Sequence, residues 1–163
     1  LTILGQSLDG LYENIGVGAF FSNTRHRCDF LRLKDFTEDW DLAFNRINAL
    51  EPQGYTRMGP AIRHATKILS DSHTKRKFLL LISDARPTDY DAYEGIHGEQ
   101  DIRRSILEAE TDGIRVHCLA ITDKKTNHLQ QMFGPNQFQY LRDPEALYKN
   151  IFDLYARILK LAH

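Results

Sequence analysis

The sequence lacks the features that mark several specialised classes of protein. It has no apolar run of roughly 18 residues, the length that a membrane-spanning helix requires. Its 21 basic residues are balanced by 22 acidic ones, so no net positive charge favours binding to nucleic acid. P-loop, G-x-S-x-G and C-x-x-C motifs are also absent. We therefore expect neither nucleic-acid binding nor membrane insertion, and find no signature of nucleotide, serine-hydrolase or dithiol chemistry.

Cysteine is scarce as well. The two cysteines, Cys28 and Cys118, both lie in apolar stretches that resemble strands. We expect buried, reduced thiols rather than a disulfide, which favours a cytoplasmic protein. The seven histidines show no spacing typical of metal ligands. The chain begins with Leu1 rather than Met, in a stretch that resembles the end of a helix, and we expect it to be part of a longer protein.

What the sequence does contain is an alternation of strand-like and helix-like segments over 163 residues, a length typical of one domain. Alternating apolar residues predict a strand at 15–21, and a short polar link leads to a second at 28–36, which we expect to be an antiparallel edge strand. Further strands are predicted at 77–83, 114–122 and 137–141, and helices at 37–49, from after Thr56 to about 70, at 99–113, at 127–133, and from Asp143 through Leu161.

This order predicts an α/β protein with a mostly parallel central sheet between two layers of helices. In such sheets ligands bind at the carboxyl ends of the strands. The stretch "LLLISDARPTDYDAYEG" runs from an apolar strand directly into Asp84 and a polar loop. The predicted fold therefore places this carboxylate at the edge where sites are built.

A second candidate metal ligand besides Asp84 is Thr56, which lies in another loop, "GYTRMGP". A hydroxyl and a carboxylate are the oxygen ligands that a hard cation such as Mg²⁺ prefers, with water completing the octahedron. The alternative is structural, with Asp84 capping the next turn or helix. Seven neighbouring residues are candidates either for bracing these loops or for contacting a partner, and the sequence favours neither role: Tyr55, Arg57, Asp89, Tyr90, Asp91, Tyr93 and Glu94.

The segments "GYTRMGPAIRHAT" and "LLLISDARPTDYDAYEG" together resemble the von Willebrand factor A domain of NorD, the nitric oxide reductase activation protein, and of its relative CbbO. The similarity extends from about Gly5 through the final predicted helix, so we expect residues 1–163 to form one such domain from the C-terminal part of a longer protein. The resemblance implies a metal-ion-dependent adhesion site built from three loops. By position, Thr56 resembles the threonine of the second loop and Asp84 the aspartate of the third.

The sequence departs from the family pattern in the first of these loops. The D-x-S-x-S motif occurs nowhere, and we expect it, with the first strand of the sheet, to lie upstream of Leu1, so that the fold is incomplete at its N-terminus. A divalent cation held by Thr56 and Asp84 alone should bind weakly. Ala85 also stands where a glycine is common, which disfavours a positive φ there.

The resemblance implies a non-catalytic binding module whose metal accepts a carboxylate from a partner. The implied partner is a MoxR-type AAA+ ATPase of the NorQ or CbbQ kind, and the pair would remodel a metalloenzyme client such as nitric oxide reductase or Rubisco. Two alternatives stay open. One is a metal-dependent phosphohydrolase that uses the carboxylates of the segment 84–91, although no nucleophile or phosphate-binding loop is evident. The other is a scaffold whose metal site does not function.

Overall fold

A computed structural model describes residues 14–122 and 127–142. Two compact units can be distinguished, one containing residues 14–19 and 31–53 and the other residues 20–30, 54–122 and 127–142. The final helix predicted from Asp143 onward, and the opening segment before residue 14, lie outside the described residues. None of the helices within the described ranges is long and apolar enough to cross a membrane.

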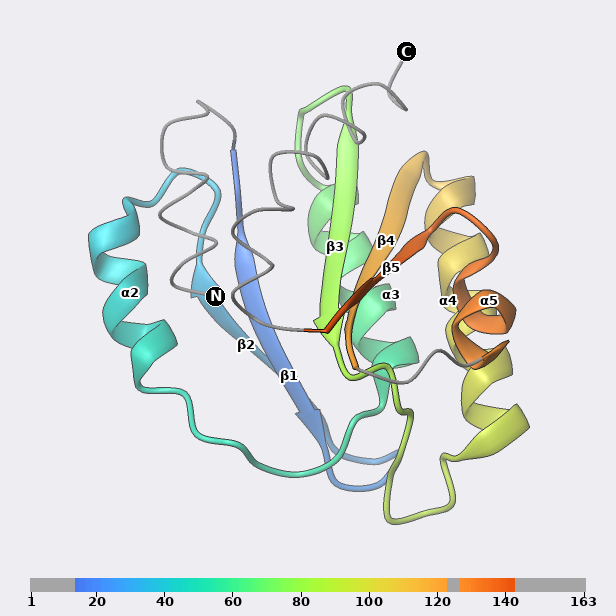
Figure 1. Cartoon of the computed structure of the whole chain (residues 1–163). Helices are drawn as coiled ribbons and strands as arrows, with labels where there is room; N and C mark the ends of the chain where they lie inside the picture. Colours follow the sequence, from blue (N-terminus) through green and yellow to red (C-terminus); the bar gives the residue numbers. More distant parts are fainter. Residues whose placement is uncertain (1–13, 123–126, 143–163) are drawn as a thin grey trace. The chain divides into compact units, whose positions relative to one another are not determined.

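The first unit is organised around one amphipathic helix, α2 (Trp40–Asn48). Its apolar residues Trp40, Ala43 and Ile47 recur at helical spacing and are buried against Leu33. Leu33 belongs to β2 (Cys28–Lys34), which forms an antiparallel two-stranded sheet with β1 (Val17–Ser22) (Figure 1). The predicted hairpin is therefore present, although its strands and α2 are shorter than the sequence pattern indicated.

The second unit is built on a parallel sheet in which the strands follow the order β3, β4, β5. Cys118 of the middle strand lies opposite Leu81 on one side and Phe138 on the other. Among the described residues, no strand pairs with the free edge of the first strand. The strands are β3 (Lys77–Ser83), β4 (Ile114–Ile121) and β5 (Phe138–Leu141).

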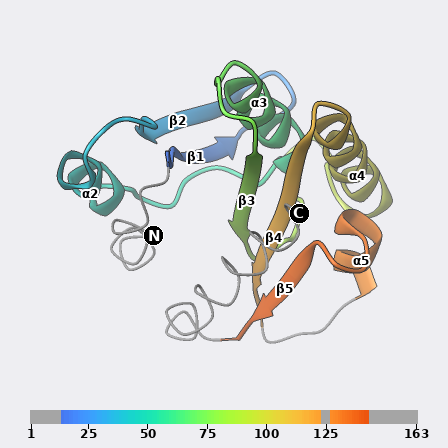
Figure 2. The ribbon, with the colours of Figure 1, turned by 90° about the horizontal axis from the view of Figure 1, so that it is seen from above.

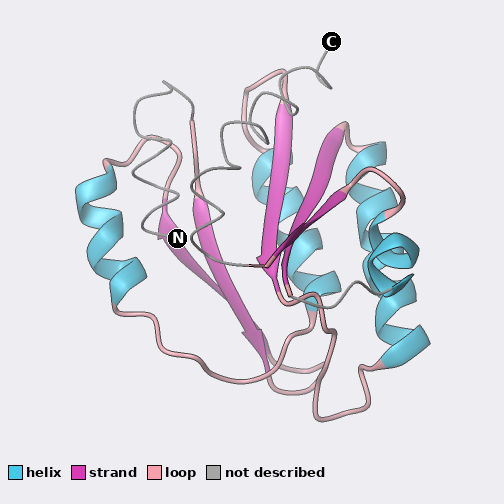
Figure 3. Cartoon of the chain, in the orientation of Figure 1, coloured by secondary structure: helices cyan, strands magenta, loops and turns pink. Residues whose placement is uncertain are grey.

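Three helices cover one face of this sheet and lie side by side, as Figures 2 and 3 show. They are α3 (Met58–Ser70), α4 (Gly95–Thr111) and α5 (Asn127–Phe133). The core between the helices and the sheet is apolar and contains Ile62, Ile102, Val116, Cys118 and Phe133. This core accounts for the apolar residues on the face of β3 and β4 that the helices cover.

The mostly parallel α/β fold expected from the sequence is confirmed. Two local expectations were wrong. Helix α4 begins at Gly95 rather than near Glu99, because Glu94 is still extended and Gly95 takes a positive φ of 54° at the start of the helix. Cys28 is exposed and not buried, since it lies at the start of β2 beside a surface turn, whereas Cys118 is buried as expected. Both cysteines are free thiols.

Candidate functional site

Three loops of the second unit are joined by short stretches of backbone pairing. The β1–β2 turn (residues 23–27) follows Ser22, which exchanges two backbone hydrogen bonds with Tyr55, at 2.8 and 3.0 Å. The next residue, Thr56, exchanges two more with Thr88, at 2.9 and 3.3 Å. The segment before α3 is therefore bound on one side to the turn and on the other to the β3–α4 loop (residues 84–94).

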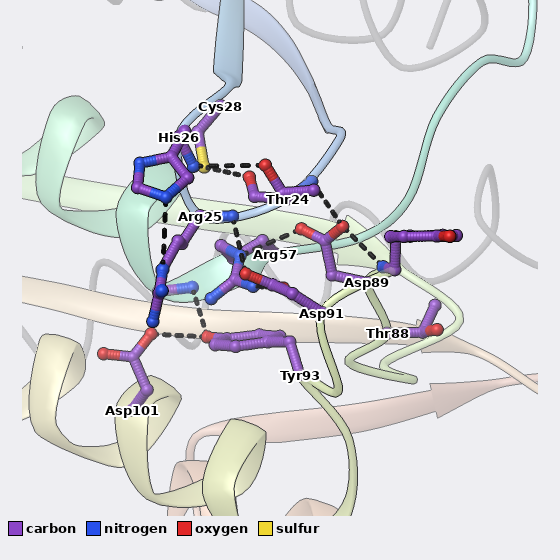
Figure 4. Close-up of polar contacts among 12 residues, drawn as sticks. Thr24, Arg25, His26, Cys28, Arg57, Thr88, Asp89, Asp91, Tyr93 and Asp101 are labelled. Carbon is purple, nitrogen blue, oxygen red and sulfur yellow. Dashed lines mark hydrogen bonds and ion pairs between the residues drawn. The ribbon is translucent and has the colours of Figure 1, made fainter.

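A buried ion pair lies at the centre of this junction (Figure 4). Arg57 Nε donates to Asp89 Oδ2 at 2.9 Å, and the Asp89 side chain is fully buried. Asp89 Oδ1 accepts the backbone N–H groups of Thr24 and Tyr90, both at 2.7 Å. Burial alone would raise the pKa of Asp89, but the Thr24 N–H and the Arg57 guanidinium outweigh it, so the pKa lies below its ordinary value. The carboxylate is thus held in its ionised form by three loops at once.

Arg57 has two further contacts that fix its position. Its Nη2 forms an ion pair with Asp91 Oδ1, while Asp91 Oδ2 accepts the backbone N–H of Arg25 at 2.9 Å. The guanidinium carbon also lies 4.1 Å from the centre of the Tyr93 ring, a cation–π contact. Arg57 therefore joins the segment before α3 to the β3–α4 loop through two carboxylates and one aromatic face, and the same two carboxylates bind the turn (Figure 4).

Tyr93 extends this network to the helices. Its hydroxyl accepts the backbone N–H of Gly59 at 3.2 Å and donates to Asp101 Oδ2 at 2.5 Å. Asp101 also pairs with Arg63 of α3 at 2.8 Å. A Cβ at Gly59 would lie 1.9 Å from Asp101 Oδ2, so only glycine allows this approach of α3 and α4. Burial, reinforced by Asp101, raises the pKa of Tyr93 far above its ordinary value, and its hydroxyl keeps its proton.

The same loops hold all the strained backbone that the described residues contain outside glycine. Thr24, Ala85 and Ala92 have φ values of 70°, 56° and 63°, in the left-handed region that residues with a Cβ rarely adopt. The positive φ of Ala85 occurs although alanine disfavours it. Such conformations cost on the order of 1–3 kcal/mol each and persist where the surroundings enforce them. They cluster in proteins at functional sites, which makes this junction a candidate.

The two predicted metal ligands lie beside this network and are not part of it. Asp84 is exposed at the carboxyl end of β3, where its Oδ1 accepts the N–H of Arg86 at 3.2 Å. The pairing of Thr56 with Thr88 brings the second loop to the same β3–α4 loop that begins at Asp84. No hydrogen bond from within the described ranges occupies Asp84 Oδ2 or the Thr56 hydroxyl.

The chemistry of these two groups fits a hard divalent cation, because both offer oxygen. Two protein ligands, however, are too few to bind the cation tightly. The part of the chain that the structure describes contains no cluster of three or more His, Cys, Asp or Glu residues able to hold a metal ion. A cation bound by Thr56 and Asp84 would need further ligands from water or from residues outside the described ranges.

The residues proposed either to brace the loops or to contact a partner now have defined surroundings. Arg57, Asp89 and Asp91 make bracing contacts, and Glu94 accepts the Thr88 hydroxyl at 3.3 Å. Tyr55 pairs through its backbone, and the residue is 39% exposed. Contact of any of them with a partner stays a prediction.

Sequence reasoning missed three members of the network, Thr24, Gly59 and Asp101, and included Tyr93 among the residues that either brace the loop or contact a partner. A signal existed for the Arg57 partners, since the D-x-D spacing of Asp89 and Asp91 suits a forked guanidinium. No local pattern indicates that Tyr93 reaches across to Gly59.

Residues 5–153 match the von Willebrand factor type A domain family, and the chain belongs to that family. It is 36% identical over 146 residues to protein NorD of Stutzerimonas stutzeri, an alignment covering 89% of this chain and 24% of that protein. An uncharacterised protein of Pseudomonas aeruginosa is 35% identical over 159 residues (97% and 26% covered), and protein NorD of Brucella suis 35% identical over 135 residues (82% and 21% covered).

These relatives identify the chain as a von Willebrand factor type A domain of the NorD-like family, as the two sequence segments indicated. The chain spans about a quarter of the length of the curated relatives it matches.

Proposed function

We propose that this domain is the non-catalytic binding module of a NorD-type accessory protein. The observation that carries the proposal is the exposed Asp84 at the carboxyl end of β3, beside a second loop that presents Thr56. This edge of a parallel sheet is where α/β folds bind ligands. The family membership and the similarity to proteins named NorD support an interaction role.

In this proposal Thr56 and Asp84 supply two oxygen ligands to Mg²⁺ or another divalent cation, and a partner carboxylate supplies another. Because Mg²⁺ gives up its waters reluctantly, two protein ligands improve little on the hydrated ion. We expect binding of the metal to this chain alone to be roughly millimolar or weaker. Isothermal titration with Mg²⁺ tests this, and a tight site would mean that the ligand set is wrong.

The proposed partner is a MoxR-type AAA+ ATPase of the NorQ or CbbQ kind, with a metalloenzyme as the client of the pair. Nitric oxide reductase and Rubisco are the client classes that the two family branches suggest. The phosphohydrolase alternative gains no support from the geometry. Two of the carboxylates it would use, Asp89 and Asp91, are already paired with Arg57.

The decisive experiment measures binding of the purified ATPase to the full-length protein with Mg²⁺ and with EDTA. Asp84→Ala should abolish the Mg²⁺-dependent part of the binding and leave the fold intact. Asp71→Ala is the matched control, since Asp71 is also exposed but lies before β3, at the opposite end of that strand. Full-strength, metal-dependent binding by the Asp84→Ala protein would refute the metal-site mechanism.

A further inference from the structure

Thr56, one of the two proposed metal ligands, is attached to the β3–α4 loop by a very short backbone pairing. Its N–H donates to the Thr88 carbonyl at 2.9 Å and its carbonyl accepts the Thr88 N–H at 3.3 Å, and this bridge is isolated. One residue further along, the antiparallel register would place Arg57 opposite Pro87, which has no N–H to donate. Because two hydrogen bonds between loops contribute only modestly to stability, the position of Thr56 depends on side-chain contacts as well.

The residue after Thr56 supplies these contacts. The Arg57 side chain is 9% exposed, and its Nε donates to Asp89 Oδ2 at 2.9 Å. This ion pair joins the residue after Thr56 to the residue after Thr88, and so braces the isolated bridge from the adjacent position. A second ion pair, with Asp91, fixes the other arm of the guanidinium. The location of the Thr56 hydroxyl relative to the β3–α4 loop therefore follows from the geometry of these two ion pairs.

The charge of Arg57 can be separated from its geometry. A guanidinium one residue from Thr56 would by itself repel a cation, but the two carboxylates that it binds offset its charge. A lysine at this position would keep the positive charge, yet its single ammonium lacks the planar fork that bridges two carboxylates. The substitution Arg57→Lys therefore changes the position of the neighbouring threonine and leaves the net charge of the site unchanged.

We propose that Arg57 is a positioning residue of the metal site. Its ion pairs with Asp89 and Asp91 hold the Thr56 hydroxyl where it can share a divalent cation with Asp84. The inference rests on the proposed function and deepens it, because it adds a residue that controls the same site without touching the cation. Replacing a group that orients a metal ligand typically lowers metal affinity about 10–100-fold.

The test measures the Mg²⁺ concentration that gives half-maximal binding of the purified ATPase to the full-length protein, at constant ionic strength. Arg57→Lys should raise this concentration about tenfold, with full binding restored at saturating Mg²⁺. Arg63→Lys is the matched control and should leave the concentration unchanged. Arg63 also lies on one side of α3 and bridges two carboxylates, those of Asp101 and Glu108, but it is remote in sequence from Thr56.

Circular dichroism confirms that each variant is folded at the temperature of the assay, so that a loss of folded protein is not mistaken for a loss of metal affinity. If Arg57→Lys does not fold, Asp91→Glu takes its place. The Asp91 side chain is 27% exposed, and this change keeps every charge while it displaces the carboxylate that Arg57 binds. A raised Mg²⁺ concentration is again the expected result.

The outcomes separate this inference from the proposed function. A rise with Arg57→Lys, or with its substitute, and none with Arg63→Lys supports the positioning role. No rise, or an equal rise in the control, overturns that role. If Asp84→Ala still abolishes the Mg²⁺-dependent binding in that case, the proposed function stands without it. Wild-type binding that does not depend on Mg²⁺ overturns both.

Discussion

The β3–α4 loop contains two aspartates with contrasting surroundings, one exposed to solvent and one buried. Asp84, at its start, is exposed, and within the described ranges its side chain is bonded only to the nearby residues Ser83 and Arg86. Asp89, five residues later, is buried and bonded to Thr24 and Arg57, which lie 65 and 32 residues away in the chain. The same residue type thus supplies a solvent-facing group in one place and a structural anchor in the other.

The difference shows how an exposed site can be held in place without being covered. The anchoring bonds converge on Asp89, Asp91 and Tyr93, and the residues between and beside them stay open to solvent. Stability and binding should therefore respond to different substitutions in one short loop. Four predictions test that separation, ordered by the size of the expected effect.

The largest effect on stability should come from Asp89→Ala. It leaves the Arg57 guanidinium, whose side chain is 9% exposed, without its buried partner. Removing one member of a buried, hydrogen-bonded pair costs about 2–4 kcal/mol, tempered here by the remaining Asp91 contact. Urea denaturation measures the free energy of unfolding, with Asp71→Ala as the exposed control. A loss below about 0.5 kcal/mol, the range of surface substitutions, would show that the pair does not anchor the loop.

Gly59→Ala should have the second largest effect, about 1–3 kcal/mol, the range for forcing extra atoms into a packed site. The added Cβ would meet Asp101 Oδ2 at 1.9 Å and the Tyr93 hydroxyl at 2.9 Å. Because the clash needs the carboxylate, the same substitution should cost less in an Asp101→Ala background. A double-mutant cycle on the free energy of unfolding measures this. Equal costs in both backgrounds would contradict the observed approach of the helices.

The third effect is a pH dependence. The folded protein holds the pKa of Asp89 below its ordinary value, so the ionised carboxylate contributes stability above the unfolded pKa. That contribution is lost as pH falls through the folded value. The stability difference between wild type and Asp89→Asn should therefore narrow as the pH falls below about 4, the ordinary pKa of an aspartate. Groups common to both proteins, such as Glu108, whose pKa Arg63 also lowers, cancel in this comparison. A constant difference would mean that the charge of Asp89 is not what stabilises the loop.

The smallest effect should come from Asp84→Ala, within about 0.5 kcal/mol, as for other exposed positions away from caps and cores. Thermal unfolding of the two proteins side by side measures it. A large loss of stability would remove the contrast between the two ends of the loop, and would make Asp84 unsuitable as a test of metal-dependent binding.

The sequence predicted elements where apolar periodicity is strong. The strand at 77–83 and the short helix at 127–133 were predicted with their observed bounds, because an uninterrupted apolar run and an isolated helical face each allow one interpretation. The start of α4 was predicted too late, since its first turn contains two glycines, Gly95 and Gly98, and little apolar periodicity. Cys28 appeared buried from its neighbours, but a residue at the end of an edge strand need not be covered.

By itself the sequence determined the α/β class, the order of the elements and the family, through local periodicity and two motifs of contiguous residues. It also placed Asp84 at the end of a strand. Only the tertiary structure decided which carboxylates of the loop form ion pairs and hydrogen bonds that hold the loops together. Thr24, Arg57, Asp89, Tyr93 and Asp101 meet across separations of up to 65 residues. No local pattern encodes such contacts, because they depend on how strands and helices that are distant in the sequence pack together.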